Sequence, residues 1–259
     1  MVNVQGDAET ELELDRIDEL IERSISNWQV ETTSFFSPRT WSIAVEKAEA
    51  MADVRVVALG GYPNAERRIV VCGREESMMD VDESSRVGIV ALRCTGNFIF
   101  DRATHPDFLG AVLGTGISRW NIGDILVSGE DGATIICLES IAEHLTSALV
   151  QVRSVPVQTR RIEWSDLRVP EQRTKEIKTV EASLRIDAIA SAGYGCSRAK
   201  ASLAIKEGAV KVNYLVVTKP SALVEEGAVL SWSGKGRLVV EAIETTSKGK
   251  FVVQMKRAY

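Results

Sequence analysis

The chain has 259 residues, of which 45% are hydrophobic and 26% are charged, a composition typical of a soluble globular protein with one large domain or two to three small ones. No run of residues approaches the length of about 18 apolar residues that a transmembrane helix needs, so we expect no membrane insertion. The first residues also lack the basic and apolar regions of a secretory signal and the character of an organelle transit peptide.

The charge is unevenly distributed along the chain. The formal net charge is −5, from 31 Lys and Arg against 36 Asp and Glu, which taken whole argues weakly against binding to nucleic acid. From Glu181 to Tyr259 there are 12 Lys and Arg against 7 Asp and Glu, whereas residues 1–180 hold 19 and 29. The last third is therefore basic, at +5, and the rest is acidic, at −10, and such an asymmetry is itself a signal of function that the net charge hides.

Cysteine and histidine predict no site. Each cysteine lies in or beside an apolar run, and their spacing matches no zinc motif, so we expect reduced and mostly buried thiols. The residues concerned are Cys72, Cys94, Cys137 and Cys196. His105 and His144 have no surrounding motif of a metal site or a catalytic triad, and we expect no metal and no cofactor.

Residues 1–34 predict an acidic amphipathic helix. We expect a helix from about Glu9 to Asn27, because apolar residues within 7–31 recur at a spacing of three to four, as on one helix face. They are Leu12, Ile17, Leu20, Ile21, Ile25 and Trp28. The acidic face is explained either by solvation or by docking of a basic protein partner.

Residues 35–164 predict an α+β body. Ser37 and Pro38 are suited to start a helix that runs to about Ala52. Residues 54–59 and 68–72 read as two strands of a hairpin-like pair, and residues 87–94 as a further strand.

The second half of this body is a mixture of strands and helices without regular βαβ alternation. Thr104 is suited to cap a helix through Leu113, with Gly114 at its left-handed C-terminal position. A strand begins near Ile122, and a helix over 140–150 lies between strands over 133–138 and 155–164. Residues 165–182 are expected to be a linker.

Residues 183–259 predict a small C-terminal domain of two short helices followed by short strands. Arg185 opens the first helix, and Ser197 is suited to cap the second. Arg198 and Lys200 then place cations beside the free N–H groups of a helix N-terminus, which is a favourable position for phosphate.

The order of motifs in this domain is distinctive. It runs through Arg185-Ile-Asp187, Ser197-Arg-Ala-Lys200, Ile205-Lys-Glu-Gly208, Val210-Lys-Val-Asn213, Lys219-Pro-Ser221 and Glu226-Gly227. This order resembles the S4-type (αL-motif) RNA-binding domain, in which two helices form the surface that faces structured RNA. The resemblance and the charges together give as candidate RNA-binding residues Arg185, Ser197, Arg198, Lys200, Lys206, Lys211, Asn213, Lys219, Lys235 and Arg237.

Tyr214 is a departure from this pattern, because many members of the family have Gly at that position. Tyrosine resists the positive φ that such a turn often needs, so we expect the turn to differ here. Stacking of an exposed Tyr214 on a base is the alternative role for the side chain.

The whole chain resembles the YlmH-like proteins, whose cyanobacterial and plastid relatives are called photosystem II S4 domain proteins. The resemblance rests on Ser37-Pro38 after a Phe pair, on residues 105–110 and 117–125, and on the terminal S4 domain. It implies a non-catalytic RNA-binding protein that acts on rRNA or tRNA of stalled large ribosomal subunits. It also implies a cytoplasmic location, or the chloroplast stroma in a photosynthetic eukaryote.

Two alternatives stay open. S4 domains often guide pseudouridine synthases and methyltransferases, so the chain is alternatively an RNA-modifying enzyme. Arg185-Ile-Asp187 is only superficially like a synthase loop, and Leu59-Gly-Gly61 is a faint candidate for a methyltransferase loop. A thylakoid-associated assembly factor is the remaining alternative, although an acidic helix is poorly suited to an anionic lipid surface.

Overall fold

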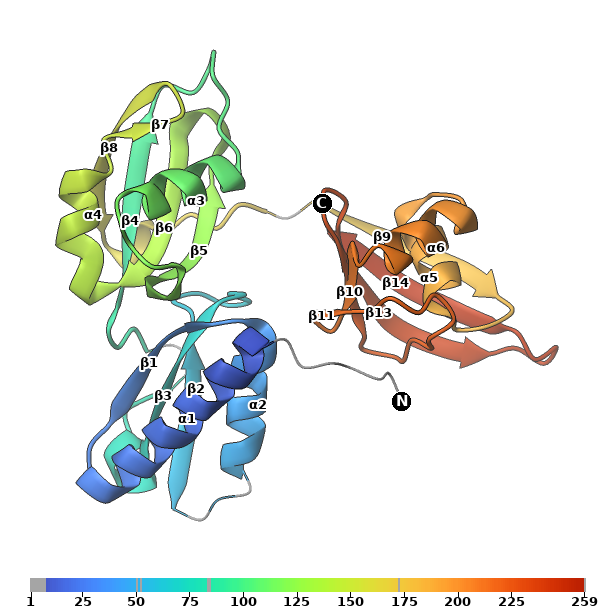
Figure 1. Cartoon of the computed structure of the whole chain (residues 1–259), viewed down its shortest axis with the longest axis horizontal. Coiled ribbons are helices and arrows are strands. Elements are labelled where there is room, and N and C mark those ends of the chain that lie inside the picture. The colour runs from blue at the N-terminus through green and yellow to red at the C-terminus, as the bar shows by residue number, and fades with distance from the viewer. Residues whose placement is uncertain (1–7, 50, 52, 83–84, 172, 259) are drawn as a thin grey trace. The chain divides into compact units, whose positions relative to one another are not determined.

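The computed structural model describes residues 8–49, 51, 53–82, 85–171 and 173–258 (Figure 1). They form two compact units, an N-terminal unit over Glu9–Pro170 and a C-terminal unit that begins at Glu171. Helices and antiparallel sheets are mixed in both units, which confirms the predicted α+β class. Within the described residues every helix is too short or too polar to cross a bilayer.

The N-terminal unit begins with a three-stranded antiparallel sheet in the order β1–β3–β2. Its strands are β1 (Glu31–Phe36), β3 (Arg68–Arg74) and β2 (Val54–Leu59), and two helices accompany it, α1 (Ala8–Asn27) and α2 (Pro38–Glu49). The pairing of β2 with β3 confirms the predicted hairpin-like pair. Strand β1 was not predicted, because its apolar residues are confined to the Phe pair at its end and give no alternating pattern.

The adjacent residues Phe35 and Phe36 show how this sheet is covered on both faces. Successive side chains of a strand point to opposite faces. Phe36 packs with Ile17 and Leu20 of α1, whereas Phe35 belongs to a core that continues to Ile136 of the next sheet. The acidic helix is therefore part of the core of this unit and not a separate element over residues 1–34.

The second sheet of the N-terminal unit has the strand order β5–β6–β4–β8–β7. Its elements are β4 (Ile89–Gly96), α3 (His105–Gly114), β5 (Ile122–Val127), β6 (Gly132–Leu138), α4 (Ala142–Ala148), β7 (Gln151–Val152) and β8 (Val155–Ile162). Thr104 occupies the N-cap position of α3 as predicted, in a capping box with Asp107, whose Oδ2 accepts hydrogen bonds from the Thr104 backbone N–H at 2.8 Å and from its hydroxyl at 2.6 Å. The expected left-handed Gly114 is wrong: the helix continues through it, and Gly116 has the positive φ, +87°.

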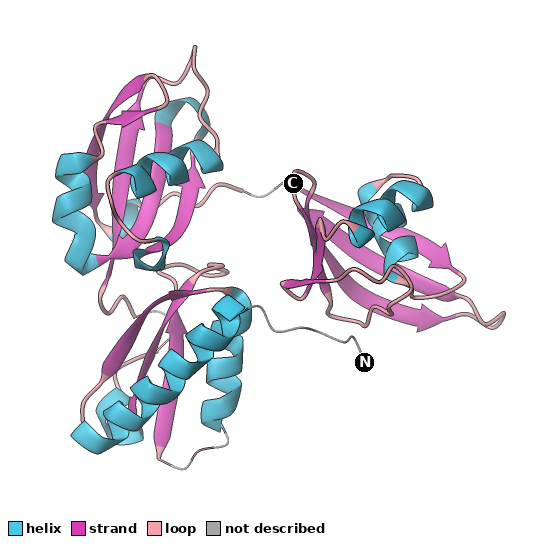
Figure 2. Ribbon diagram, viewed as in Figure 1, coloured by secondary structure: helices cyan, strands magenta, loops and turns pink. Residues whose placement is uncertain are grey.

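The C-terminal unit consists of two helices and a six-stranded antiparallel sheet in the order β11–β10–β12–β13–β14–β9 (Figure 2). The helices share a hydrophobic core with the sheet. The elements are β9 (Thr174–Glu181), α5 (Ile186–Tyr194), α6 (Arg198–Lys206), β10 (Val210–Val212), β11 (Leu215–Val216), β12 (Val229–Trp232), β13 (Gly236–Thr245) and β14 (Phe251–Ala258). Gly193 allows α5 to approach the sheet, because a Cβ there would overlap Leu238.

Strand β9 corrects the predicted linker over residues 165–182. It pairs with β14 along its whole length, from Thr174 opposite Ala258 to Glu181 opposite Phe251. As an edge strand it stays largely exposed, and its charged residues suit such a position. The same polarity is the reason that the sequence resembled a linker.

Candidate nucleic-acid interface

The start of α6 has the geometry that the sequence predicted. Ser197 caps the helix, and its hydroxyl accepts a hydrogen bond from the backbone N–H of Lys200 at 3.2 Å. Arg198 and Lys200 lie in the first turn and are both exposed. Two cations therefore stand beside a helix N-terminus, where the helix dipole also favours an anion.

Asp187 links the starts of the two helices. Its carboxylate accepts hydrogen bonds from Arg185 Nε at 3.1 Å and Nη2 at 2.8 Å, and from Arg198 Nη2 at 3.0 Å. The Asp187 side chain is only 6% exposed, whereas those of Arg185 and Arg198 are 37% and 54% exposed. The hydrogen bond from Arg185, followed by that from Arg198, holds the pKa of Asp187 below its usual range. One buried carboxylate thus fixes two half-exposed guanidinium groups.

Asp187 lies within the Arg185-Ile-Asp187 motif but is not among the residues predicted from the sequence to bind RNA. The signal was present, because a carboxylate two residues after an arginine that opens a helix is placed to bind that arginine. The participation of Arg198, eleven residues further on, depends on how α6 packs against α5 and has no local signature in the sequence.

A loop brings Lys219 to the same end of α5. The backbone N–H of Ile186 donates to the carbonyl of Ala222 at 2.8 Å, and that of Asp187 to Pro220 at 3.2 Å. Lys219 precedes this contact directly and is exposed. We call the set Arg185, Arg198, Lys200 and Lys219 the cation patch.

Lys211 and Arg237 lie on another face of the C-terminal unit. They belong to one row across the sheet, in which Lys211 and Arg237 are both opposite Ser231. The neighbours Val210 and Val212 are buried in the core with the helices. Alternation along the strand therefore points Lys211 and Arg237 away from α5 and α6, and they do not join the cation patch.

Asn213 and Tyr214 form the two-residue turn between β10 and β11. Their φ values are +48° and +67°, so the expectation that Tyr214 would change the turn is wrong: tyrosine adopts the left-handed conformation here. Asn213 Oδ1 accepts a hydrogen bond from Val229 N at 2.8 Å, which gives Asn213 a role within its own sheet. The Arg237 guanidinium lies 5.5 Å from the centre of the Tyr214 ring.

Lys206 and Lys235 also lie away from the cation patch. Lys206 is in the last turn of α6, about 12 Å along the helix from Arg198. Lys235 Nζ lies 3.8 Å from the centre of the Trp232 ring, which packs against Tyr194 at the far end of α5. Of the ten candidate residues, the structure therefore brings five together, the cation patch and the capping Ser197.

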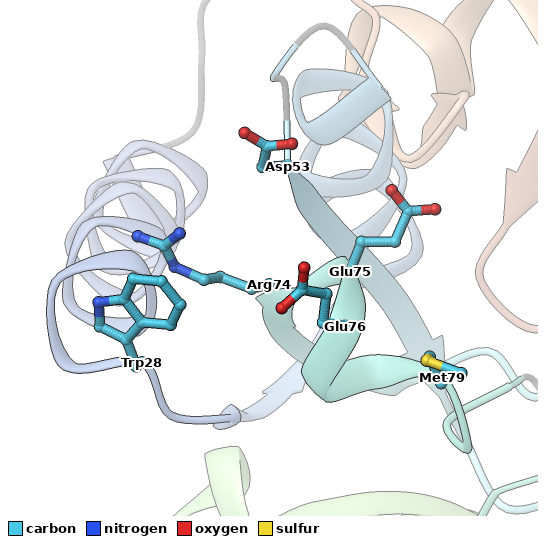
Figure 3. Close-up of a pocket in the computed structure, with 6 residues that line it drawn as sticks. All are labelled: Trp28, Asp53, Arg74, Glu75, Glu76 and Met79. Atoms are coloured by element: carbon cyan, nitrogen blue, oxygen red, sulfur yellow. The ribbon is translucent and has the colours of Figure 1, made fainter.

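The N-terminal unit contains a pocket of a different character, with a volume of about 460 Å³ (Figure 3). Its lining is Trp28, Asp53, Arg74, Glu75, Glu76 and Met79. Arg74 points toward Trp28, and its guanidinium lies 3.4 Å from the ring centre. Three carboxylates against one guanidinium repel phosphate, so this pocket is unsuited to the RNA backbone.

Comparison with known proteins follows the same division of the chain. The family model for the YlmH N-terminal domain matches residues 9–77, and the model "Putative RNA-binding domain in YlmH" matches residues 87–166. The S4 domain model matches residues 184–230. The ribosome-associated protein quality control protein P2 of Bacillus subtilis is 32% identical over 231 residues, which cover 89% of this chain and 88% of that protein. The chain belongs to the YlmH family.

A solved structure of the YlmH family has a related fold. It is the cell division protein ylmH from Streptococcus pneumoniae, with a TM-score of 0.52 and 19% identity, covering 64% of this chain and 98% of that one. The S4 match ends within β12, yet β13, β14 and β9 complete the same sheet. The C-terminal unit of this YlmH-family protein is therefore larger than the S4 match that it contains.

Proposed function

We propose that this YlmH-family protein binds structured RNA of the large ribosomal subunit through its cation patch and takes part in quality control of stalled subunits. The observation that carries the proposal is the pair Arg185 and Arg198, held by the buried Asp187 at the start of two helices. The resemblance of residues 184–230 to the S4 domain and the name of the model over residues 87–166, "Putative RNA-binding domain in YlmH", support RNA as a partner. The name of the Bacillus subtilis relative supports the ribosome. The same relative, a bacterial protein, supports a cytoplasmic location.

The geometry suits recognition of an RNA backbone. A guanidinium that is already fixed by a carboxylate loses less side-chain entropy when it meets a phosphate than a free one does. Arg185 and Arg198 retain exposed surface on the side away from Asp187, and Lys200 and Lys219 add point charges. These cations contact phosphates and make no contact that distinguishes one base from another. The shape of the folded RNA, which sets where its phosphates lie, therefore determines which RNA is bound.

The proposal does not include catalysis. Asp187, the carboxylate of the loop that resembles a synthase motif, is engaged with two arginines. At the faint methyltransferase candidate, Gly60 and Gly61 pack tightly against Ala65 and Trp164. These glycines therefore serve packing, which supports binding as the function.

Charge reversal within the patch tests the proposal. In Lys200→Glu/Lys219→Glu we expect weaker binding to large subunits and a salt dependence of log K that is less steep by about 1.4 to 1.8, because two phosphate contacts are lost. The measurement is sedimentation binding across a salt series.

Lys248→Glu/Lys250→Glu is the matched control, since it makes the same change of charge on two exposed lysines of the β13–β14 turn. Equal losses in the two variants would show that net charge, and not the cation patch, governs binding. Unchanged affinity in the patch variant would refute the proposed surface.

A further inference from the structure

The loop between β4 and α3 exposes two adjacent apolar side chains. Phe100 is 95% exposed and Ile99 is 52% exposed. The loop projects beyond the end of the second sheet (Figure 2). Isolated apolar residues on a surface are common, but an almost wholly exposed phenylalanine at the end of a projecting loop keeps its full hydrophobic cost in water.

The residues on both sides of this tip are anchored. Phe98 is fully buried, its ring lies 5.3 Å from that of Phe108, and its backbone N–H donates to the carbonyl of Glu130. Asp101 accepts hydrogen bonds from Arg153 Nε at 2.7 Å and from the Ser154 hydroxyl at 2.6 Å. The backbone on both sides of Ile99 and Phe100 is therefore held in place. This lowers the conformational entropy that is lost when the two side chains insert into a partner.

The charges around the tip indicate the kind of partner. Asp101 and Asp107 are both paired with Arg153, and Glu130 is paired with Arg102. Asp131 is exposed beside Glu130 and adds a further negative charge. The four carboxylates outnumber the two arginines, so the surroundings repel a phosphate backbone and favour a basic protein surface.

We propose that Ile99 and Phe100 insert into an apolar pocket on a basic protein of the large ribosomal subunit. The proposal rests on the proposed function for its setting and adds a protein contact that is separate from the cation patch. Burial of one phenylalanine accounts for an affinity gain of about 10- to 100-fold that is independent of salt, because no counterion is released.

The first test uses Phe100→Ser with purified large subunits. We expect a loss of affinity of about 10- to 100-fold with an unchanged slope of log K against log salt, the reverse of the effect at the cation patch. Val150→Ser is the matched control, since Val150 is a 63% exposed apolar residue between α4 and β7, in the part of the chain that contains the second sheet. Both variants should keep the unfolding midpoint of the parent chain. Equal affinities of Phe100→Ser and the parent would overturn the proposal.

The second test identifies the partner. A photo-crosslinking amino acid replaces Phe100, and the products on large subunits are analysed for protein and for rRNA. A crosslink to a ribosomal protein supports the proposal. A crosslink to rRNA, or no crosslink from a chain that binds subunits, overturns it. Failure of the parent chain to bind subunits would instead refute the proposed function, and is seen before any variant is made.

Discussion

Asp124 in the N-terminal unit and Asp187 in the C-terminal unit each accept several hydrogen bonds, but from different kinds of donor. Asp124 accepts hydrogen bonds from the Tyr62 hydroxyl and the Glu66 N–H at 2.7 Å each, and from the Arg67 N–H at 3.1 Å. Asp187 accepts from Arg185 and Arg198. The first carboxylate fixes backbone between two sheets, whereas the second fixes cations that reach the surface.

The difference shows how one residue type holds neutral donors, mostly of the backbone, in one unit and holds cations at the surface in the other. Around Asp124, burial and then the nearby carboxylate raise the pKa of Tyr62, so its hydroxyl stays a neutral donor. Around Asp187 the donors are cations, and their charge remains after pairing. Over residues 171–259 there are 15 Lys and Arg against 9 Asp and Glu, so the C-terminal unit is positive beyond this network as well.

The largest effect is expected from Asp187→Asn. The substitution leaves two arginines without their carboxylate, and we expect the C-terminal unit to lose about 2–3 kcal/mol of unfolding free energy, less than for a fully buried pair because both arginines are partly exposed. RNA affinity should fall although the variant gains positive charge, because the guanidinium groups lose their orientation. Hydrogen exchange, read separately for each unit, and RNA binding measure the two effects.

The pH dependence of the same variant is its internal check. The pKa of Asp187 is lowered in the folded state, so its contribution is fully present above the unfolded value of about 3.9 and is lost as the pH falls through the lower folded value. The difference in stability between the parent and Asp187→Asn should therefore shrink below about pH 4. In the RNA-binding assay, tighter binding by Asp187→Asn than by the parent chain would contradict the expected loss of affinity. It would show that the positive charge of the arginines, and not their orientation, determines affinity.

Asp124→Ala should have a smaller effect, confined to the N-terminal unit. Three hydrogen bonds are lost, two of them from backbone N–H groups, and we expect a loss of about 1–3 kcal/mol in unfolding free energy. RNA affinity should equal that of the parent chain, which urea unfolding and a binding assay can establish on the same preparation. A fall in affinity to match that of Asp187→Asn would remove the distinction between the two networks.

The sequence predicted the elements that carry a local signal. The stripe on α1, the Thr104 cap and the Ser197 cap depend on residues within one or two helical turns. The structure confirms both cap positions and, of the stripe, Ile17, Leu20, Ile21 and Ile25. Trp28 instead follows the helix and is 63% exposed, and the Leu12 side chain lies outside the described part of the chain. The sequence does not predict strand β9, because an edge strand is polar and the residues of its partner β14 lie 70 to 84 positions away along the chain. The division of the candidate cations between two faces of the sheet likewise depends on register and helix packing, which no spacing in the sequence reveals.

The smallest effect is expected from charge reversal on α1, in Glu19→Lys/Glu22→Lys. Both residues are exposed, and residues 1–170 hold 16 Lys and Arg against 27 Asp and Glu. If this surplus limits non-specific RNA binding, the variant should bind unrelated RNA about 2- to 5-fold more tightly near 0.01 M salt, where the Debye length is about 30 Å, and equally at 0.15 M, where it is about 8 Å. Glu19→Gln/Glu22→Gln should give about half of the change in binding free energy, since it alters half as much charge.

Weaker binding of the lysine variant to large subunits, with no change on naked RNA, would instead assign the α1 acids to a basic protein partner. The acidic helix would then be a docking surface in its own right, and the N-terminal unit would contribute a second protein contact besides the one proposed for Ile99 and Phe100.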